Sequence, residues 1–227
     1  MAEPRRPGRV EGILAKYDEI PLLRGLVQLV PLGIGSALDA TLATHLNNLR
    51  TRRAAALFGE LERRGCLVPA EWMEKEEVLH AALLALRTAL NTHRHEKIEQ
   101  FARLFDGYAR YRIVESVDEY EEMLRVLDDL SMREFNALLI LHDLSEKTPR
   151  QPNENDLQWV SRFWEDFAKR VEQEVGVPRE ELGGFLARLN RTGLYQTIVG
   201  AFYDYHGDKG TPTPLLSRFL DVLQSDP

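Results

Sequence analysis

The chain has 227 residues, of which 44% are hydrophobic and 29% charged, with a formal net charge of −7 and a pI near 5.5. It is long enough to bury one large core or two smaller ones, and too apolar to be intrinsically disordered. The single cysteine, Cys66, excludes an internal disulfide framework and a metal site built from several cysteines. It fits a reducing compartment, so we expect a folded, cytoplasmic protein.

The start of the chain does not predict a secretory signal. Early arginines are present, but Lys16, Asp18 and Glu19 interrupt any apolar region behind them. A signal peptide needs an uninterrupted apolar stretch after its basic residues.

Apolar residues with a helical period fill most of the front half. Leucines from Leu38 to Leu61 lie on one face of a helix, and Gly65 follows a basic pair as a helix stop should. This pattern predicts a long helix over about residues 36–64. Two further apolar stripes predict a hairpin or a kinked pair of helices, with the break at residues 91–93.

Two sequence signals fix helix starts in the middle of the chain. Ser116 is followed three residues later by Glu119, and Ser131 by Glu134. A hydroxyl and a carboxylate at this spacing form a capping box, which satisfies the free amides of a first helical turn. We therefore expect helices to begin near residues 117 and 132.

The back half then alternates breakers with amphipathic helices. Residues 146–155, EKTPRQPNEN, have two prolines and no apolar side chain, and they predict a linker. Helices are expected over 156–175, closed by Gly176, and over 179–191, followed by Gly193. An aromatic strand from Tyr195 to Tyr205, the turn HGDKG and a short proline-limited return strand predict a β-hairpin.

Three helices followed by a hairpin is the order of elements in a winged-helix domain. The phrases LSMREFNALLILHDL and LARLNRTGLY resemble the first helix and the end of the third helix of winged-helix proteins, and the resemblance covers about the last 95 residues. The front half, with PLLRGLVQLVPLGIGSALD ahead of an arginine-bearing helix, is similar to uncharacterised bacterial helical proteins. We predict a mainly α protein, with a helical bundle over residues 1–112 and a winged-helix-like domain with a short β-hairpin over residues 113–227.

The charge of the second half disfavours nucleic acid as its partner. Residues 113–227 carry 12 Lys and Arg against 22 Asp and Glu, whereas residues 1–112 carry 17 against 14. DNA-binding domains are normally basic, because phosphate contacts supply most of their affinity. If the third helix and the wing did bind DNA, their cations would be Arg179, Arg188, Arg191 and Lys209. Glu180 and Glu181 lie in the first turn of that helix and would repel phosphate.

A second unusual segment covers residues 20–43 and is rich in leucine, glycine and proline. Its uncharged part, Gly25–Leu38, is too short to cross a bilayer as a helix, but it could lie on a membrane surface or bind a partner. The residues that would form this face are Leu26, Val30, Leu32 and Ile34. The interpretation that we favour is that Pro31 separates two core helices and that the segment is buried against the long helix after it.

Metal-binding and catalytic patterns are sparse. Glu77 and His80 have the Glu-x-x-His spacing that places a carboxylate and an imidazole on one helix face, and His93 and His95 lie at a helix junction. A di-iron bundle needs a second Glu-x-x-His on another helix, and the sequence has none. The stretch GIGS at residues 33–36 lacks the third glycine of a dinucleotide-binding loop and the lysine of a P-loop. We therefore expect neither a metal nor another cofactor.

These observations together predict a non-enzymatic interaction module that acts by binding a protein partner. Three alternatives remain open: a DNA-binding regulator, a membrane-surface effector built on residues 20–43, and a metal-dependent enzyme using His80 and His93.

Overall fold

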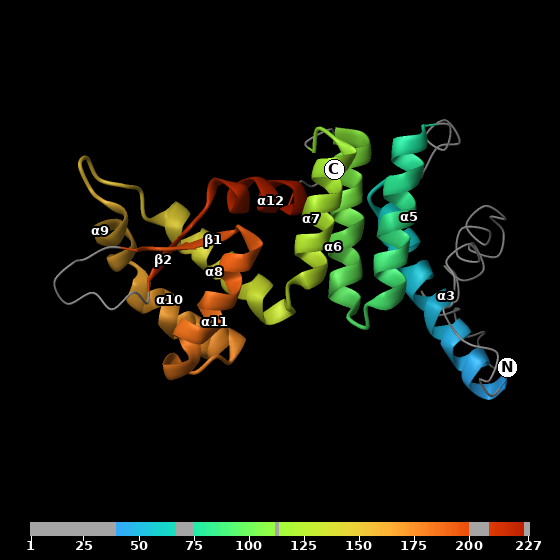
Figure 1. The fold of residues 1–227 in the computed structure, drawn as a ribbon, viewed down its shortest axis with the longest axis horizontal. Helices are drawn as coiled ribbons and strands as arrows, with labels where there is room; N and C mark the ends of the chain where they lie inside the picture. The colour runs from blue at the N-terminus through green and yellow to red at the C-terminus, as the bar shows by residue number, and fades with distance from the viewer. Residues whose placement is uncertain (1–39, 67–74, 112–113, 200–208, 225–227) are drawn as a thin grey trace, which may run out of the picture. The chain divides into compact units, whose positions relative to one another are not determined.

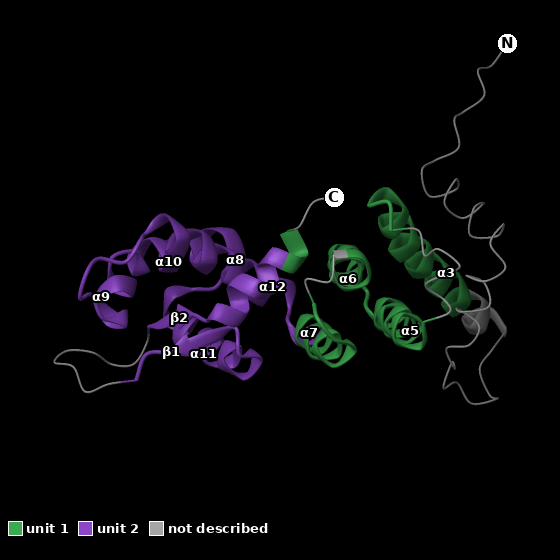
Figure 2. Cartoon of the chain, turned by 90° about the horizontal axis from the view of Figure 1, so that it is seen from above, with its two compact units in different colours: residues 1–127, 222–227 green, residues 128–221 purple. Residues whose placement is uncertain are grey.

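The computed structural model describes residues 40–66, 75–111, 114–199 and 209–224 (Figure 1). Within these ranges the protein is mainly α-helical, with nine α-helices and a two-stranded antiparallel sheet near the C-terminus, so the predicted fold class is confirmed at this level. The chain forms two compact units (Figure 2), unit 1 with residues 1–127 and 222–227 and unit 2 with residues 128–221. The sequence had placed the division after residue 112.

Unit 1 is a set of packed helices. They are α3 (Ala40–Arg63), α5 (Glu76–Asn91), α6 (His95–Asp106), a π-helical turn η1 (Gly107–Tyr111) and α7 (Val117–Asp129) up to residue 127. The long helix ends next to Gly65, whose φ of 70° lies in the left-handed region that glycine adopts without strain. The break between α5 and α6 also falls where the sequence predicts it.

The core of unit 1 is centred on the fully buried Tyr120 of α7. Its ring stacks on Tyr108 with 5.1 Å between centroids and meets Phe105 edge to face at 6.3 Å. Its hydroxyl donates to the carbonyl of Ala81 in α5 at 3.4 Å. Burial raises the pKa of this phenol, so it stays a neutral donor. One aromatic side chain thus ties α5, α6 and α7 together.

Unit 2 contains a series of helical elements, a two-stranded hairpin and a final helix. Its elements are α8 (Met132–Lys147), α9 (Asp156–Ser161), α10 (Trp164–Arg170), η2 (Val171–Val175), η3 (Arg179–Glu181), α11 (Leu182–Leu189), η4 (Asn190–Thr192), β1 (Tyr195–Thr197), β2 (Gly210–Pro212) and α12 (Pro214–Gln224) up to residue 221. In the sheet Tyr195 pairs with Pro212 and Thr197 with Gly210. The predicted strand residues 200–205 and most of the HGDKG turn lie outside the described residues.

Two details of unit 2 differ from the sequence prediction. The helix expected over 156–175 is interrupted at Phe163, whose φ of −122° and ψ of 0° are not helical, and the buried ring of Phe163 packs edge to face on Trp159. The predicted linker is a loop within unit 2 that is held in place by contacts with Trp159. Trp159 Nε1 donates to the carbonyl of Thr148 at 2.6 Å, and the Arg150 guanidinium lies 4.3 Å from the centre of the Trp159 ring.

Both predicted helix starts are confirmed, although the two caps differ. At α8 the capping box is complete: Ser131 Oγ accepts from Glu134 N at 3.1 Å, and Glu134 Oε2 accepts from Ser131 N at 2.8 Å. At α7 the Ser116 hydroxyl accepts from Glu119 N at 3.2 Å, whereas the Glu119 carboxylate accepts the N–H of Glu115. The hydroxyl half of the motif is enough to start the helix there.

Candidate interaction site

Two of the four predicted DNA-contacting cations converge on one carboxylate. Arg188 Nε and Arg191 Nη1 lie 3.7 and 3.5 Å from Glu134 Oε1, and Arg191 Nη2 also donates to the carbonyl of Asp129 at 3.3 Å. The Glu134 side chain is only 5% exposed. Burial opposes its ionisation, but hydrogen bonds from Ser131 and the two guanidinium groups hold its pKa below the ordinary value. The capping carboxylate of α8 therefore anchors the end of the third helix.

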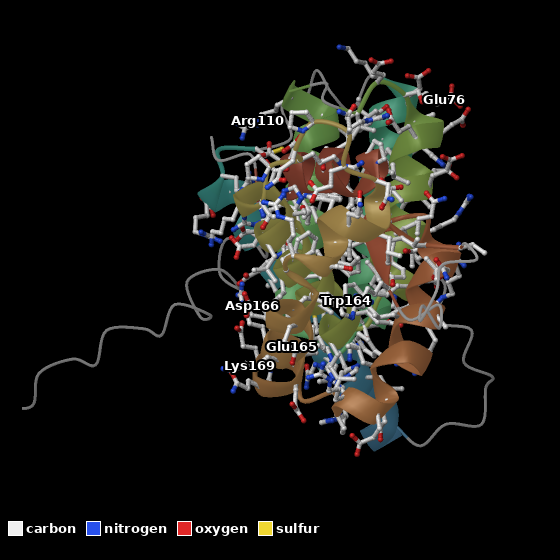
Figure 3. The ribbon with its side chains drawn as sticks, turned by 90° about the vertical axis from the view of Figure 1, so that its left-hand side faces the viewer. Glu76, Arg110, Trp164, Glu165, Asp166 and Lys169 are labelled. Carbon is white, nitrogen blue, oxygen red and sulfur yellow. The ribbon has the colours of Figure 1, made fainter. Side chains whose placement is uncertain are left out.

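The other two cations lie elsewhere in unit 2. Both guanidinium Nη atoms of Arg179 donate to the Glu165 carboxylate of α10, and these hydrogen bonds lower the pKa of Glu165. Lys209 Nζ donates to Ser161 Oγ at 2.9 Å, joining the hairpin to α9. Glu165, Asp166 and Lys169, which are labelled in Figure 3, are exposed residues of α10. The structure thus divides the predicted DNA-contacting residues into two pairs of different surroundings.

Arg179 and Lys209 border a cavity of about 280 Å³ in unit 2. Its lining residues are Ser161, Trp164, Glu165, Ala168, Arg179, Leu182, Gly183 and Lys209. One wall is apolar because of Trp164, Ala168 and Leu182, and the rim carries two cations and one carboxylate. We call this the α10 cavity. It can take a small polar side chain against an apolar wall, which is the composition of many protein–protein contact points.

A larger groove of about 920 Å³ lies in unit 1, between α3 and the start of α6. Its lining residues are Leu49, Arg52, Arg53, Ala55, Ala56, Gly59, Glu60, Glu62, Arg63, His93, His95, Ile98 and Glu99. Arg53 is one of these lining residues, and its Nη1 donates to the carbonyl of Leu90 at 2.6 Å. We call this the α3 groove. Its floor is built from small and aliphatic side chains, and both signs of charge lie around it.

The candidate metal ligands are not gathered at one point. His80 Nε2 lies 2.8 Å from Glu121 Oε1 of α7, and Arg125 Nη2 donates to the other oxygen of this carboxylate at 2.6 Å. Glu77 is exposed in the first turn of α5, and His93 and His95 line the α3 groove. In the part of the chain that the structure describes, no group of three or more His, Cys, Asp or Glu residues could hold a metal ion. The Glu-x-x-His histidine instead bridges two helices.

Sequence reasoning missed a buried ionic cluster around Asp106. Its Oδ2 accepts from Arg64 Nε at 2.9 Å and from Arg110 Nη2 at 2.8 Å, and Oδ1 accepts from Arg110 Nε. Arg110 also donates to the carbonyl of Arg64 at 2.7 Å. Burial opposes ionisation of Asp106, but the two arginines lower its pKa below the ordinary value. Two sequence signals were available: an aspartate directly after an apolar stripe, and an arginine four residues later.

The cluster also sets the state of the lone cysteine. Burial and the neighbouring Asp106 carboxylate raise the pKa of the Cys66 thiol to about 12. A thiol in this state is a poor nucleophile, because only the thiolate reacts. Cys66 is therefore a buried packing residue next to an ion pair.

The predicted membrane or partner face, with Leu26, Val30, Leu32 and Ile34, lies outside the described residues. No helix in the described part of the chain has both the length and the apolar character needed to cross a membrane. The chain matches no known protein family, no curated protein and no solved structure.

Proposed function

We propose that this protein is a non-enzymatic interaction module, and that unit 2 is a winged-helix-like domain used for protein contact. The order of elements supports the fold proposal: α8, then the interrupted α9 and α10, then α11, then the β1–β2 hairpin. In a DNA-binding winged helix, α11 would enter the major groove and the hairpin would follow the backbone.

The observation that carries the proposal is the pairing of all four candidate cations with acceptors of unit 2. Arg188 and Arg191 form ion pairs with Glu134. Arg179 forms an ion pair with Glu165, and Lys209 donates a hydrogen bond to Ser161. Three of these groups lie beside carboxylates, whose negative charge would repel a phosphate bound there. Counterion release supplies DNA affinity only for cations that can neutralise phosphates.

The charges at the start of the third helix also disfavour DNA binding. Glu180 and Glu181 are exposed in η3, directly after Arg179. Base-contacting side chains normally come from this end of a recognition helix, and here two carboxylates would face the phosphate backbone. A protein partner can instead match both signs of charge at the rim of the α10 cavity.

Affinity capture with the tagged full chain, with and without nuclease treatment, tests this function. We expect protein partners to be retained after nuclease and to be lost with the double variant Arg179→Glu, Lys209→Glu, which reverses two charges at the cavity rim. Lys169→Glu is the matched control, because Lys169 is exposed on α10 and is not a lining residue of the cavity. Capture that disappears with nuclease, or that is lost equally in the control, would contradict the proposal.

A further inference from the structure

The exposed side of α11 and of its flanking turns η3 and η4 carries an acidic, two small and a basic residue in that order. Glu180, Gly184, Ala187 and Arg191 follow one another at steps of four, three and four residues, and all four are exposed. This spacing places them along one side of a helix. The other side holds the large apolar residues that unit 2 buries, Leu182, Phe185, Leu186 and Leu189. We call the four exposed residues the α11 face.

The centre of the α11 face leaves room for a second backbone. A Cβ added to Gly183 or Gly184 would meet no atom of the described chain within 4 Å, and neither glycine has a positive φ. Packing and backbone conformation within the chain therefore do not require glycine here, although glycine is less favourable than alanine in a helix. Close approach of another backbone is a reason for glycine that the chain itself does not supply.

The α11 face is complementary to itself when two copies are antiparallel. Glu180 and Arg191 are the same number of residues from the point between Phe185 and Leu186, and so are Gly184 and Ala187. A two-fold axis through this point puts Glu180 of each copy opposite Arg191 of the other. Between these two pairs, Gly184 of each copy lies opposite Ala187 of the other. Two-fold contacts of this kind are the commonest in homo-oligomers.

We propose that the protein forms a two-fold dimer through the α11 face, with the two α11 helices antiparallel. A second copy fits this surface because both charged ends of the face meet the opposite charge. Arg191 can take part while it stays beside Glu134, since its side chain is 47% exposed and a guanidinium has five N–H donors. None of the four residues lines the α10 cavity, so the dimer is separate from the partner contact proposed there.

Sedimentation equilibrium of the purified full chain, up to about 1 mM, tests the dimer with charge-reversed variants. One pair of short helices is a small interface, so we expect a weak wild-type dimer with a Kd on the order of 0.1 mM. Glu180→Arg and Arg191→Glu should each raise Kd at least about tenfold, because like charges then meet in both contacts. An equimolar mixture of the two variants should associate again, because each contact then pairs opposite charges. Circular dichroism melts check that each variant folds.

Gly184→Leu tests the close approach without changing a charge. The space around Gly184 should let this variant fold with an undiminished Tm, whereas its side chain should block the second helix and abolish the dimer. Lys169→Leu, at an exposed position of α10, is the control and should keep the wild-type Kd. A wild type that stays monomeric, or wild-type association by Gly184→Leu, would overturn the proposal. A mixture of the two folded charge variants that does not associate would also overturn it; should Arg191→Glu fail to fold, Glu180→Arg and Gly184→Leu decide.

Discussion

Replacing Asp106 by asparagine should destabilise unit 1 by about 3 to 5 kcal/mol. Asp106 is fully buried and the Arg64 side chain is 4% exposed, so the substitution leaves an arginine charge without its carboxylate in the interior. Removing one partner of a buried ion pair typically has a cost of this size. In a protein of 150 to 250 residues this corresponds to a fall in Tm of roughly 6 to 20 °C.

Urea unfolding followed by circular dichroism measures the loss, and pH separates the mechanism from a simple packing defect. The folded-state pKa of Asp106 lies below its ordinary value of 3.8, so its contribution is present above that value and is lost as pH falls through the folded pKa. Wild type should therefore lose more stability than Asp106→Asn between neutral pH and pH values below about 4. Glu122→Gln, on the exposed face of α7, is the control and should change the unfolding free energy by less than about 0.5 kcal/mol. A loss under about 1 kcal/mol for Asp106→Asn, or parallel pH profiles, would refute the reasoning.

Three further predictions concern individual side chains. Gly107→Ala should lower the unfolding free energy by about 1 to 3 kcal/mol, because a Cβ there would lie 2.6 Å from Val222 Cγ1. The loss caused by Gly107→Ala should be much smaller when it is measured in a Val222→Ala background, where the obstructing methyl group is absent; an unchanged melting curve for Gly107→Ala would contradict this packing. Cys66, buried and with a raised pKa, should react with a thiol reagent at pH 8 far more slowly in the native protein than in urea, and equal rates would show that the cluster opens readily. Leu26→Asp should lower Tm without changing liposome flotation. If the wild type floated with anionic vesicles, and the variant did not float but melted at the same temperature as the wild type, the segment would instead bind a membrane surface.

Local signals in the sequence were sufficient for most helix boundaries. The starts of α7 and α8 followed from Ser116 and Ser131, because a cap depends on residues only three positions apart. The left-handed Gly193, with φ of 72°, likewise ends the third helix where expected. These features depend on short-range chemistry, which the sequence displays directly.

The candidate sites depend on pairings between residues far apart in the chain. Glu134 was recognised as a capping residue, but its second role depends on Arg191, 57 positions away. Arg64 and Asp106 are 42 positions apart, and only the packing of α3 against α6 brings them together. The interruption at Phe163 was not predicted either, because the apolar helical period runs unbroken through this residue in the sequence.

The central claim is that the cations of the third helix and hairpin pair with acceptors within unit 2 and do not bind DNA. Fluorescence anisotropy of a labelled DNA duplex at low salt tests this claim most directly. The wild-type full chain should show no binding at micromolar concentrations, because Arg179, Arg188, Arg191 and Lys209 are engaged by acceptors of unit 2. Micromolar or tighter binding that weakens steeply as salt rises, and that is reduced by Arg188→Ala, would contradict the account and identify the protein as a DNA binder.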